Sequence, residues 1–155
     1  MYLIGQNSEV YEYNLSTPWD ITTTVYHQNF SVATEDGSPH GLFLSTNGTN
    51  MYFSGYANDK VYQYDLSTAW DVSTAVNSKN LSVLAQTDVP TGLFFNSTGD
   101  KMYVTDWWND VILEYNLSTP WDVSTASYHQ GLSVTTKDTE PVSYTHLTLP
   151  TILLV

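Results

Sequence analysis

The chain has 155 residues, the size of one domain, and 41% of them are hydrophobic, which is enough to form a core. Sixteen acidic residues against four lysines and no arginine give a net charge of −12, which repels the phosphate backbones of DNA and RNA. Cysteine is absent, so disulfides and thiolate metal sites are excluded. No apolar run approaches the roughly 20 residues of a membrane-spanning helix, and no signal peptide is visible.

The segment Tyr-Asn-Leu-Ser-Thr-Pro-Trp-Asp organises the chain. It occupies residues 13–20, returns as Tyr-Asp-Leu-Ser-Thr-Ala-Trp-Asp at 64–71 and returns again at 115–122, so successive copies lie 51 residues apart. Pairs such as Gly41 and Gly92 keep the same step. Self-similarity at one fixed period predicts a repeat architecture.

Taken in chain order, the copies predict units of four short strands. Residues 1–39 form an incomplete first unit, because Met1-Tyr2 aligns with Met51-Tyr52, at the second strand. The predicted strands of the second unit, 40–90, are about 41–45, 50–54, 60–66 and 80–84. Those of the third unit, 91–141, are 92–96, 101–105, 111–117 and a strand around 132–134.

Strands this short, separated by turn residues, indicate an all-β fold. A four-stranded unit that repeats about every 40–50 residues is typical of a β-propeller blade. The sequence therefore predicts a partial β-propeller of about two and three-quarter four-stranded blades with a 51-residue repeat. We expect the parent protein to be a larger closed ring, in which further blades of the same chain cover the ends of this arc.

The repeat register fails after Pro141, which lies 51 residues after Pro90. Instead of opening a new blade, residues 142–151 read Val-Ser-Tyr-Thr-His-Leu-Thr-Leu-Pro-Thr. These ten residues resemble the translation of a tagmentation sequencing adapter. We therefore interpret 142–155 as a non-native tail and exclude it from fold reasoning.

Each copy of the repeated segment ends in a tryptophan and an aspartate: Trp19-Asp20, Trp70-Asp71 and Trp121-Asp122. Recurrence in every copy favours packing between blades for the tryptophans over three separate ligand sites. The aspartate carboxylate can accept a local backbone N–H in an Asx-type turn. A repeated Ca2+ site is the alternative, but it needs about six to eight oxygen ligands and no acidic loop of the EF-hand kind is present. We expect no metal and no cofactor, with Ca2+ as the open alternative.

The loops that differ between copies carry more information about function. The turns after the first and third strands are nearly constant, whereas the loops after the second strand (5–8, 55–59 and 106–110) and those joining blades (35–40 and 87–91) vary. We expect the variable loops to share one face. The candidate ligand-binding residues on that face are His40, Tyr56, Asp59, Asp106, Trp107, Trp108 and Asp110. Aromatic rings beside carboxylates suit sugar rings or a protein partner; the structural alternative is that one tryptophan caps the core.

The motifs Pro-x-Gly-Leu-Phe, Gly-x-x-Met-Tyr and the repeated octapeptide resemble bacterial and phage-borne propeller proteins of the NHL/lactonase-like (YVTN-type) superfamily. The resemblance implies the blade fold but not one activity, because propellers host many functions. The first hypothesis is a non-enzymatic module that binds a protein or glycan in an extracellular, cell-surface or virion-associated setting. The second is a lactonase-like hydrolase with chemistry at the channel mouth, where His40 stands opposite Thr91. The third is a structural arm or adhesin without a ligand.

Overall fold

The computed structural model describes residues 1–136, so the tail predicted at 142–155 lies outside the described residues. Eleven strands and three single-turn 3-10 helices are present in this part of the chain. The first sheet contains β1 (Tyr2–Gly5), β2 (Glu9–Leu15) and β3 (Thr24–Ser31). The second contains β4 (Pro39–Leu44), β5 (Asn50–Gly55), β6 (Lys60–Leu66) and β7 (Ala75–Ser82). The third contains β8 (Pro90–Phe95), β9 (Lys101–Asp106), β10 (Val111–Leu117) and β11 (Ala126–Ser133). The 3-10 helices are η1 (Ile21–Thr23), η2 (Val72–Thr74) and η3 (Val123–Thr125).

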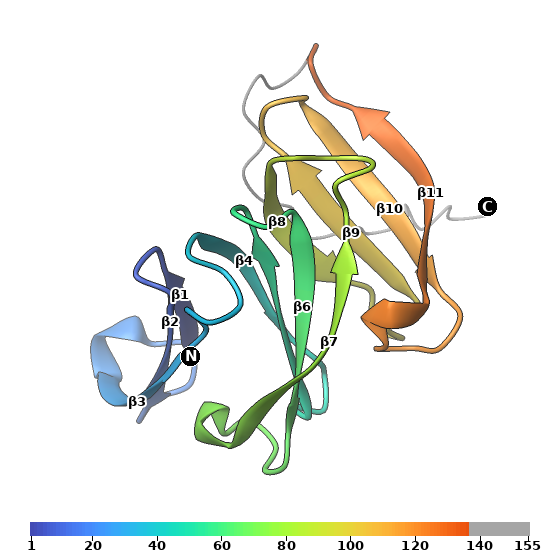
Figure 1. Ribbon diagram of the computed structural model, residues 1–155. Helices are drawn as coiled ribbons and strands as arrows, with labels where there is room; N and C mark the ends of the chain where they lie inside the picture. Colours follow the sequence, from blue (N-terminus) through green and yellow to red (C-terminus); the bar gives the residue numbers. More distant parts are fainter. Residues whose placement is uncertain (137–155) are drawn as a thin grey trace, which may run out of the picture.

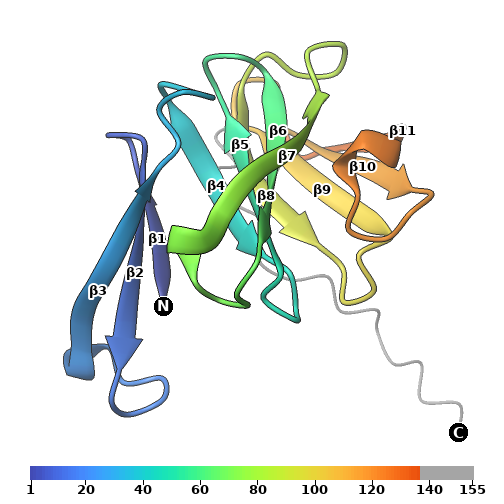
Figure 2. The ribbon, with the colours of Figure 1, turned by 60° about the horizontal axis from the view of Figure 1, so that its bottom comes forward.

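Each sheet is an antiparallel meander in which strands pair in sequence order. The three sheets stand side by side like blades, in chain order, as Figures 1 and 2 show. The first strands of the second and third blades, β4 and β8, pack against each other, and β1 packs against β4. The predicted all-β arc of three- and four-stranded blades is confirmed.

The outermost strands begin earlier than the sequence predicts. The strand expected at about 80–84 runs over Ala75–Ser82, and the one expected around 132–134 runs over Ala126–Ser133. Ladder pairing defines β7 from Ala75, opposite Leu66, to Ser82, opposite Lys60. Because this outer strand exposes most of its side chains, its hydrophobic pattern marks only part of its length.

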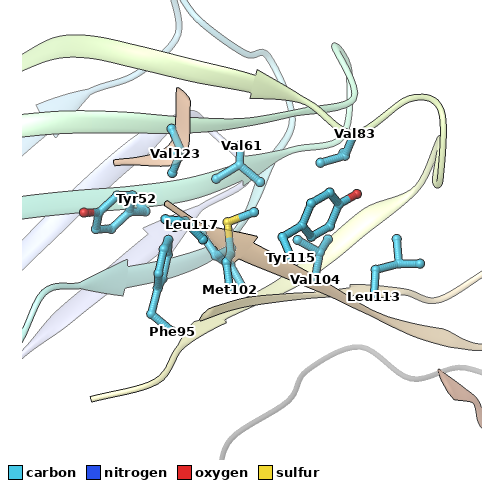
Figure 3. Packing of buried hydrophobic residues seen from close by; sticks show 11 residues of the cluster. Tyr52, Val61, Val83, Phe95, Met102, Val104, Leu113, Tyr115, Leu117 and Val123 are labelled. Carbon is cyan, nitrogen blue, oxygen red and sulfur yellow. The ribbon is translucent and has the colours of Figure 1, made fainter. Parts of the chain in front are cut away.

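The core consists of two apolar layers, each between neighbouring blades. Alternation along β5 supplies both layers: Met51 and Phe53 face the first blade, and Tyr52 faces the third. Figure 3 shows the layer between the second and third blades, where Tyr52 lies near Phe95 and Met102. The middle strands of the second blade, β5 and β6, are therefore buried on both faces. Each blade depends on its neighbours to bury its apolar side chains.

The tryptophan–aspartate turn has the same conformation in all three blades. The tryptophan adopts a left-handed φ of 66°, 69° and 67° at Trp19, Trp70 and Trp121. The aspartate then begins the 3-10 helix, and its Oδ1 accepts the backbone N–H two residues later at 3.0 Å in each copy. The expected Asx-type hydrogen bond is thus present, and it satisfies a helix N–H that would otherwise have no partner.

Tyrosine hydroxyls on the second strands join consecutive blades. Tyr2 Oη donates to the Trp70 carbonyl at 2.5 Å, and Tyr52 Oη donates to the Trp121 carbonyl at 2.7 Å. The left-handed tryptophan directs its carbonyl to the preceding blade. The unusual backbone of this turn therefore serves the contact between blades.

Side chains of the third and fourth strands complete the contact. Glu12 Oε2 accepts the backbone N–H of Val72 at 3.3 Å, and one repeat later Gln63 Oε1 accepts that of Val123 at 3.1 Å. The aspartates are contacted in the same way, in the pairs Gln28 Nε2 to Asp71 Oδ1 at 2.7 Å and Lys79 Nζ to Asp122 Oδ2 at 2.5 Å. The two blade contacts are thus built from equivalent residues one period apart.

We expect the protein to lose stability at acid pH through these aspartates. Hydrogen bonds from Ser73 and then Gln28 lower the pKa of Asp71 below its usual value of 3.8. Burial raises the pKa of Asp122, but hydrogen bonds from Lys79 and Ser124 together outweigh it, so its pKa is also lowered. Because the folded-state pKa is below the unfolded-state value, this stabilisation is present above the unfolded-state pKa and is lost as pH falls through the folded-state pKa.

Urea denaturation measured from neutral pH down to about pH 3 checks this expectation. The midpoint should fall over the lower part of that range, and less so in Asp71→Asn, which keeps a capping oxygen but does not ionise. An equal pH dependence in the variant and the natural chain would show that Asp71 contributes nothing to the acid effect.

Candidate functional site

The variable loops lie together at one end of the blades. The start of β4 pairs with the end of β5 (Pro39 opposite Gly55), and the end of β7 pairs with the start of β6 (Ser82 opposite Lys60). The backbone N–H of Tyr56 donates to the Ser38 carbonyl at 3.1 Å, which ties the loop after β5 to the loop that joins the blades. The constant turns lie at the opposite end of the strands.

Three of the predicted site residues converge on one hollow at this end. A cavity of about 430 Å³ is lined by His40, Tyr56 and Trp107, together with Gln6, Ser38 and Thr91. These residues come from loops and strand ends of all three blades. Such a volume is within the range of small-molecule sites.

His40 and Tyr56 form one wall of the hollow. Their ring centroids are 5.7 Å apart with an interplanar angle of 55°. His40 Nδ1 lies 3.1 Å from the Ser38 carbonyl, so in the neutral ring a proton on Nδ1 is donated to this oxygen and Nε2 is left as an acceptor. A second hollow of about 330 Å³ adjoins the first and shares Gln6, His40 and Thr91 with it. It continues inward along β4 and β8.

The predicted carboxylates do not line either hollow. Asp106 was expected to face a ligand, but its side chain is fully buried. Its Oδ1 accepts the backbone N–H groups of Trp108 at 2.9 Å and Asn109 at 2.8 Å, and its Oδ2 accepts Asn109 Nδ2 at 2.8 Å. The Asp106 carboxylate is therefore hydrogen-bonded within its own loop. It stabilises the conformation of the loop that carries Trp107.

Asp59 and Asp110 also have backbone roles in this structure. Both adopt φ of 51°, and their carbonyls accept the N–H of Val83 at 2.8 Å and Val134 at 2.7 Å. Burial, followed by the charges of Asp88 and Asp36, raises the pKa of Asp59. These contacts close the end of the sheet and leave neither aspartate at the hollow.

The two adjacent tryptophans point to different surroundings. Trp107 lines the hollow, whereas Trp108 is 70% exposed and is not among the lining residues. Their rings meet edge to face with centroids 5.8 Å apart. Trp108 is therefore a neighbour of the hollow that leaves most of its surface to solvent.

The sequence pattern did not single out Asp36, whose carboxylate joins the two loops that border the hollow. The side chain is buried, and its carboxylate accepts the backbone N–H groups of Ser38 at 2.8 Å, Ala57 at 3.2 Å and Asn58 at 3.0 Å. A Cβ at Gly55 would lie 2.3 Å from this carboxylate, so glycine is needed there. The signal was the Asp-Gly-Ser turn, because aspartate in a turn commonly accepts a backbone N–H two residues later.

Within residues 1–136, no three His, Cys, Asp or Glu side chains are grouped so that they could hold a metal ion. The carboxylates of Asp20, Asp71 and Asp122 are instead engaged in their turns. The same part of the chain contains no helix with the length and apolar character needed to cross a membrane.

No protein-family model matches the sequence, and no curated protein matches it significantly. Solved structures do. A putative 6-phosphogluconolactonase from Bacteroides fragilis superposes with a TM-score of 0.63 at 16% identity, over 92% of this chain and 37% of its own. The fold is that of a β-propeller.

Two further similar structures differ from each other in kind. The periplasmic gluconolactonase of Pseudomonas aeruginosa has a TM-score of 0.54 at 14% identity, over 85% of this chain and 35% of its own. The β-propeller domain of Swd1 from Myceliophteria thermophila gives 0.51 at 12%, over 83% and 38%. At these identities the likeness concerns the fold alone, and this propeller chain spans little more than a third of each structure.

Proposed function

We propose that the variable-loop face of this propeller binds a polyhydroxylated ligand, such as a sugar ring of a glycan, without converting it. The observation that carries the proposal is the convergence of His40, Tyr56 and Trp107 on one hollow of about 430 Å³. Aromatic rings can cover the apolar C–H face of a sugar. The amide of Gln6 and the hydroxyls of Ser38 and Thr91 supply neutral donors and acceptors around the rim.

The surroundings of the hollow support a neutral ligand. Among the described residues that line it, none carries a carboxylate or an ammonium group. The chain as a whole has a net charge of −12, which disfavours polyanions such as nucleic acids. A hydrogen-bonding ligand with an apolar face fits both conditions. The names of two similar structures, a gluconolactonase and a putative 6-phosphogluconolactonase, also indicate sugar-derived compounds.

A panel of soluble mono- and disaccharides tests the proposal, with saturation-transfer NMR and intrinsic tryptophan fluorescence as readouts. At least one sugar should bind, and Trp107→Ala should weaken that binding roughly tenfold or more. Trp108→Ala is the matched control, because it removes the same side chain one residue further on, outside the hollow. Binding by no sugar, or equal losses in the two variants, would contradict the proposal.

Hydrolysis of a sugar lactone is the second candidate, favoured by the position of His40 in the hollow. Its Nε2 could accept a proton from water when Nδ1 donates to the Ser38 carbonyl. We rank it second because, within residues 1–136, no carboxylate, lysine or second histidine lines either hollow beside His40. Opening of D-glucono-lactone, followed at constant pH, would favour catalysis if it exceeded the uncatalysed rate and was lost in His40→Gln.

A further inference from the structure

Trp108 is a large apolar side chain that the repeat does not require at its position. One period earlier, the same place in the loop after the second strand holds Ala57. Tyr56 and Ala57 are exposed in a blade that has a neighbour on each side, so side chains at this point of the loop reach solvent within the arc as well. Trp108 is 70% exposed and belongs to neither apolar layer of the core. A tryptophan that contributes so little to folding leaves most of its ring available to a ligand.

Trp108 continues the aromatic lining of the hollow outward. Its ring contacts that of Trp107, which lines the hollow, with the two centroids 5.8 Å apart. The backbone N–H of Trp108 donates to the buried Asp106 carboxylate at 2.9 Å, so the loop holds the backbone of this residue in place. Only the two side-chain torsions of Trp108 are then left to order, and the entropic cost of covering a ligand with its ring is small.

The relative orientation of the two indole rings limits what can bind to both. Their planes meet at 84°, so a single flat ring cannot stack on both of them. A ligand that uses both must offer two separate apolar faces, joined by a link that turns between them. The units of an oligosaccharide meet this condition, because each sugar ring has its own C–H face and the glycosidic bond between rings rotates.

We propose that Trp108 is an outer subsite for a further sugar unit, so that the variable-loop face binds an oligosaccharide rather than a single sugar. One end of the ligand occupies the hollow between His40, Tyr56 and Trp107, and the rest of the ligand leaves the hollow across Trp108. The outer subsite rests on the proposed function, since it requires the hollow to bind a sugar.

NMR titration with cello-, malto- and N-acetylchito-oligosaccharides, from the monosaccharide to the hexasaccharide, tests the outer subsite. Within a series that binds, the affinity of the natural chain should rise about tenfold or more from the disaccharide to the longest member. Trp108→Ala should remove most of this gain and leave the affinity for the monosaccharide within about twofold of the natural value. Trp107→Ala should weaken binding at every length, because Trp107 lines the hollow.

Two further variants separate stacking on Trp108 from general effects of an exposed ring. Trp108→Phe keeps a smaller aromatic face and should retain part of the gain with length. Trp19→Ala removes another exposed tryptophan, at the end of the blades that carries the constant turns, and should have no effect at any length. Circular dichroism confirms that each variant remains folded.

An affinity that does not rise with length, or a rise that Trp108→Ala leaves intact, would overturn the outer subsite while the hollow still bound sugar. If no member of the three series bound, the outer subsite would also be rejected. The panel of mono- and disaccharides would then decide separately whether the hollow binds a sugar at all.

Discussion

Gly41→Ala is expected to lower the free energy of unfolding by about 3 kcal/mol, at the upper end for overpacking a tight core. Gly41 lies on β4, where this strand approaches β8 of the next blade. A Cβ at this position would lie 2.6 Å from the Leu93 nitrogen, 2.7 Å from the Thr91 oxygen and 2.9 Å from the Gly92 carbonyl carbon. All three are backbone atoms, so no side-chain rotation can relieve the clash, and the two inner strands must separate.

Gly37→Ala is the matched control for this prediction. A Cβ at Gly37 meets nothing within 4 Å, and its φ is not in the left-handed region. The same substitution should therefore change the free energy of unfolding by less than about 0.5 kcal/mol. Urea denaturation of both variants measures the difference, and similar midpoints for the two would mean that β4 and β8 do not approach as closely as described.

The fold could be predicted because the same octapeptide recurs three times, 51 residues apart, among similar short strand patterns. Turn chemistry agrees with the repeat pattern: Gly99 lies in the turn after β8, where glycine suits a positive φ, and it adopts 74°. The left-handed φ of Trp121 could not be predicted, because tryptophan has no intrinsic preference for that region. Trp19 adopts the same φ without a preceding blade, so the turn itself holds this conformation: in the third copy the Asp122 N–H donates to the Thr119 carbonyl at 3.2 Å, and the equivalent bond is present in the other two copies.

The sequence indicated which loops border the hollow but not how their side chains are oriented. Differences between copies pointed to the loops that contain Tyr56 and Trp107, and both side chains line the hollow. The same loops contain Asp106, whose side chain turns inward because the backbone N–H groups of its own turn compete for the carboxylate. For Asp36 the competition extends to a different loop, 21 residues away at Ala57, which no local pattern reveals.

The second large effect concerns Trp121, which the repeat pattern alone makes equivalent to Trp19. In the structure their backbone turns are the same, but the surroundings of the two rings differ. The Trp121 ring lies over Gly99, where a Cβ would come within 2.2 Å of it, and its centroid is 6.3 Å from that of Phe43 and 5.7 Å from that of Phe95. Trp19 is 98% exposed. We expect Trp121→Ala to cost about 2–4 kcal/mol in unfolding free energy, because it opens a cavity between two blades.

Trp19→Ala provides the control within the same motif. It should change the unfolding free energy by less than about 0.5 kcal/mol, since its ring is almost fully exposed to solvent. Equal losses in the two variants would show that the tryptophan acts within its own turn and not through the packing of its ring.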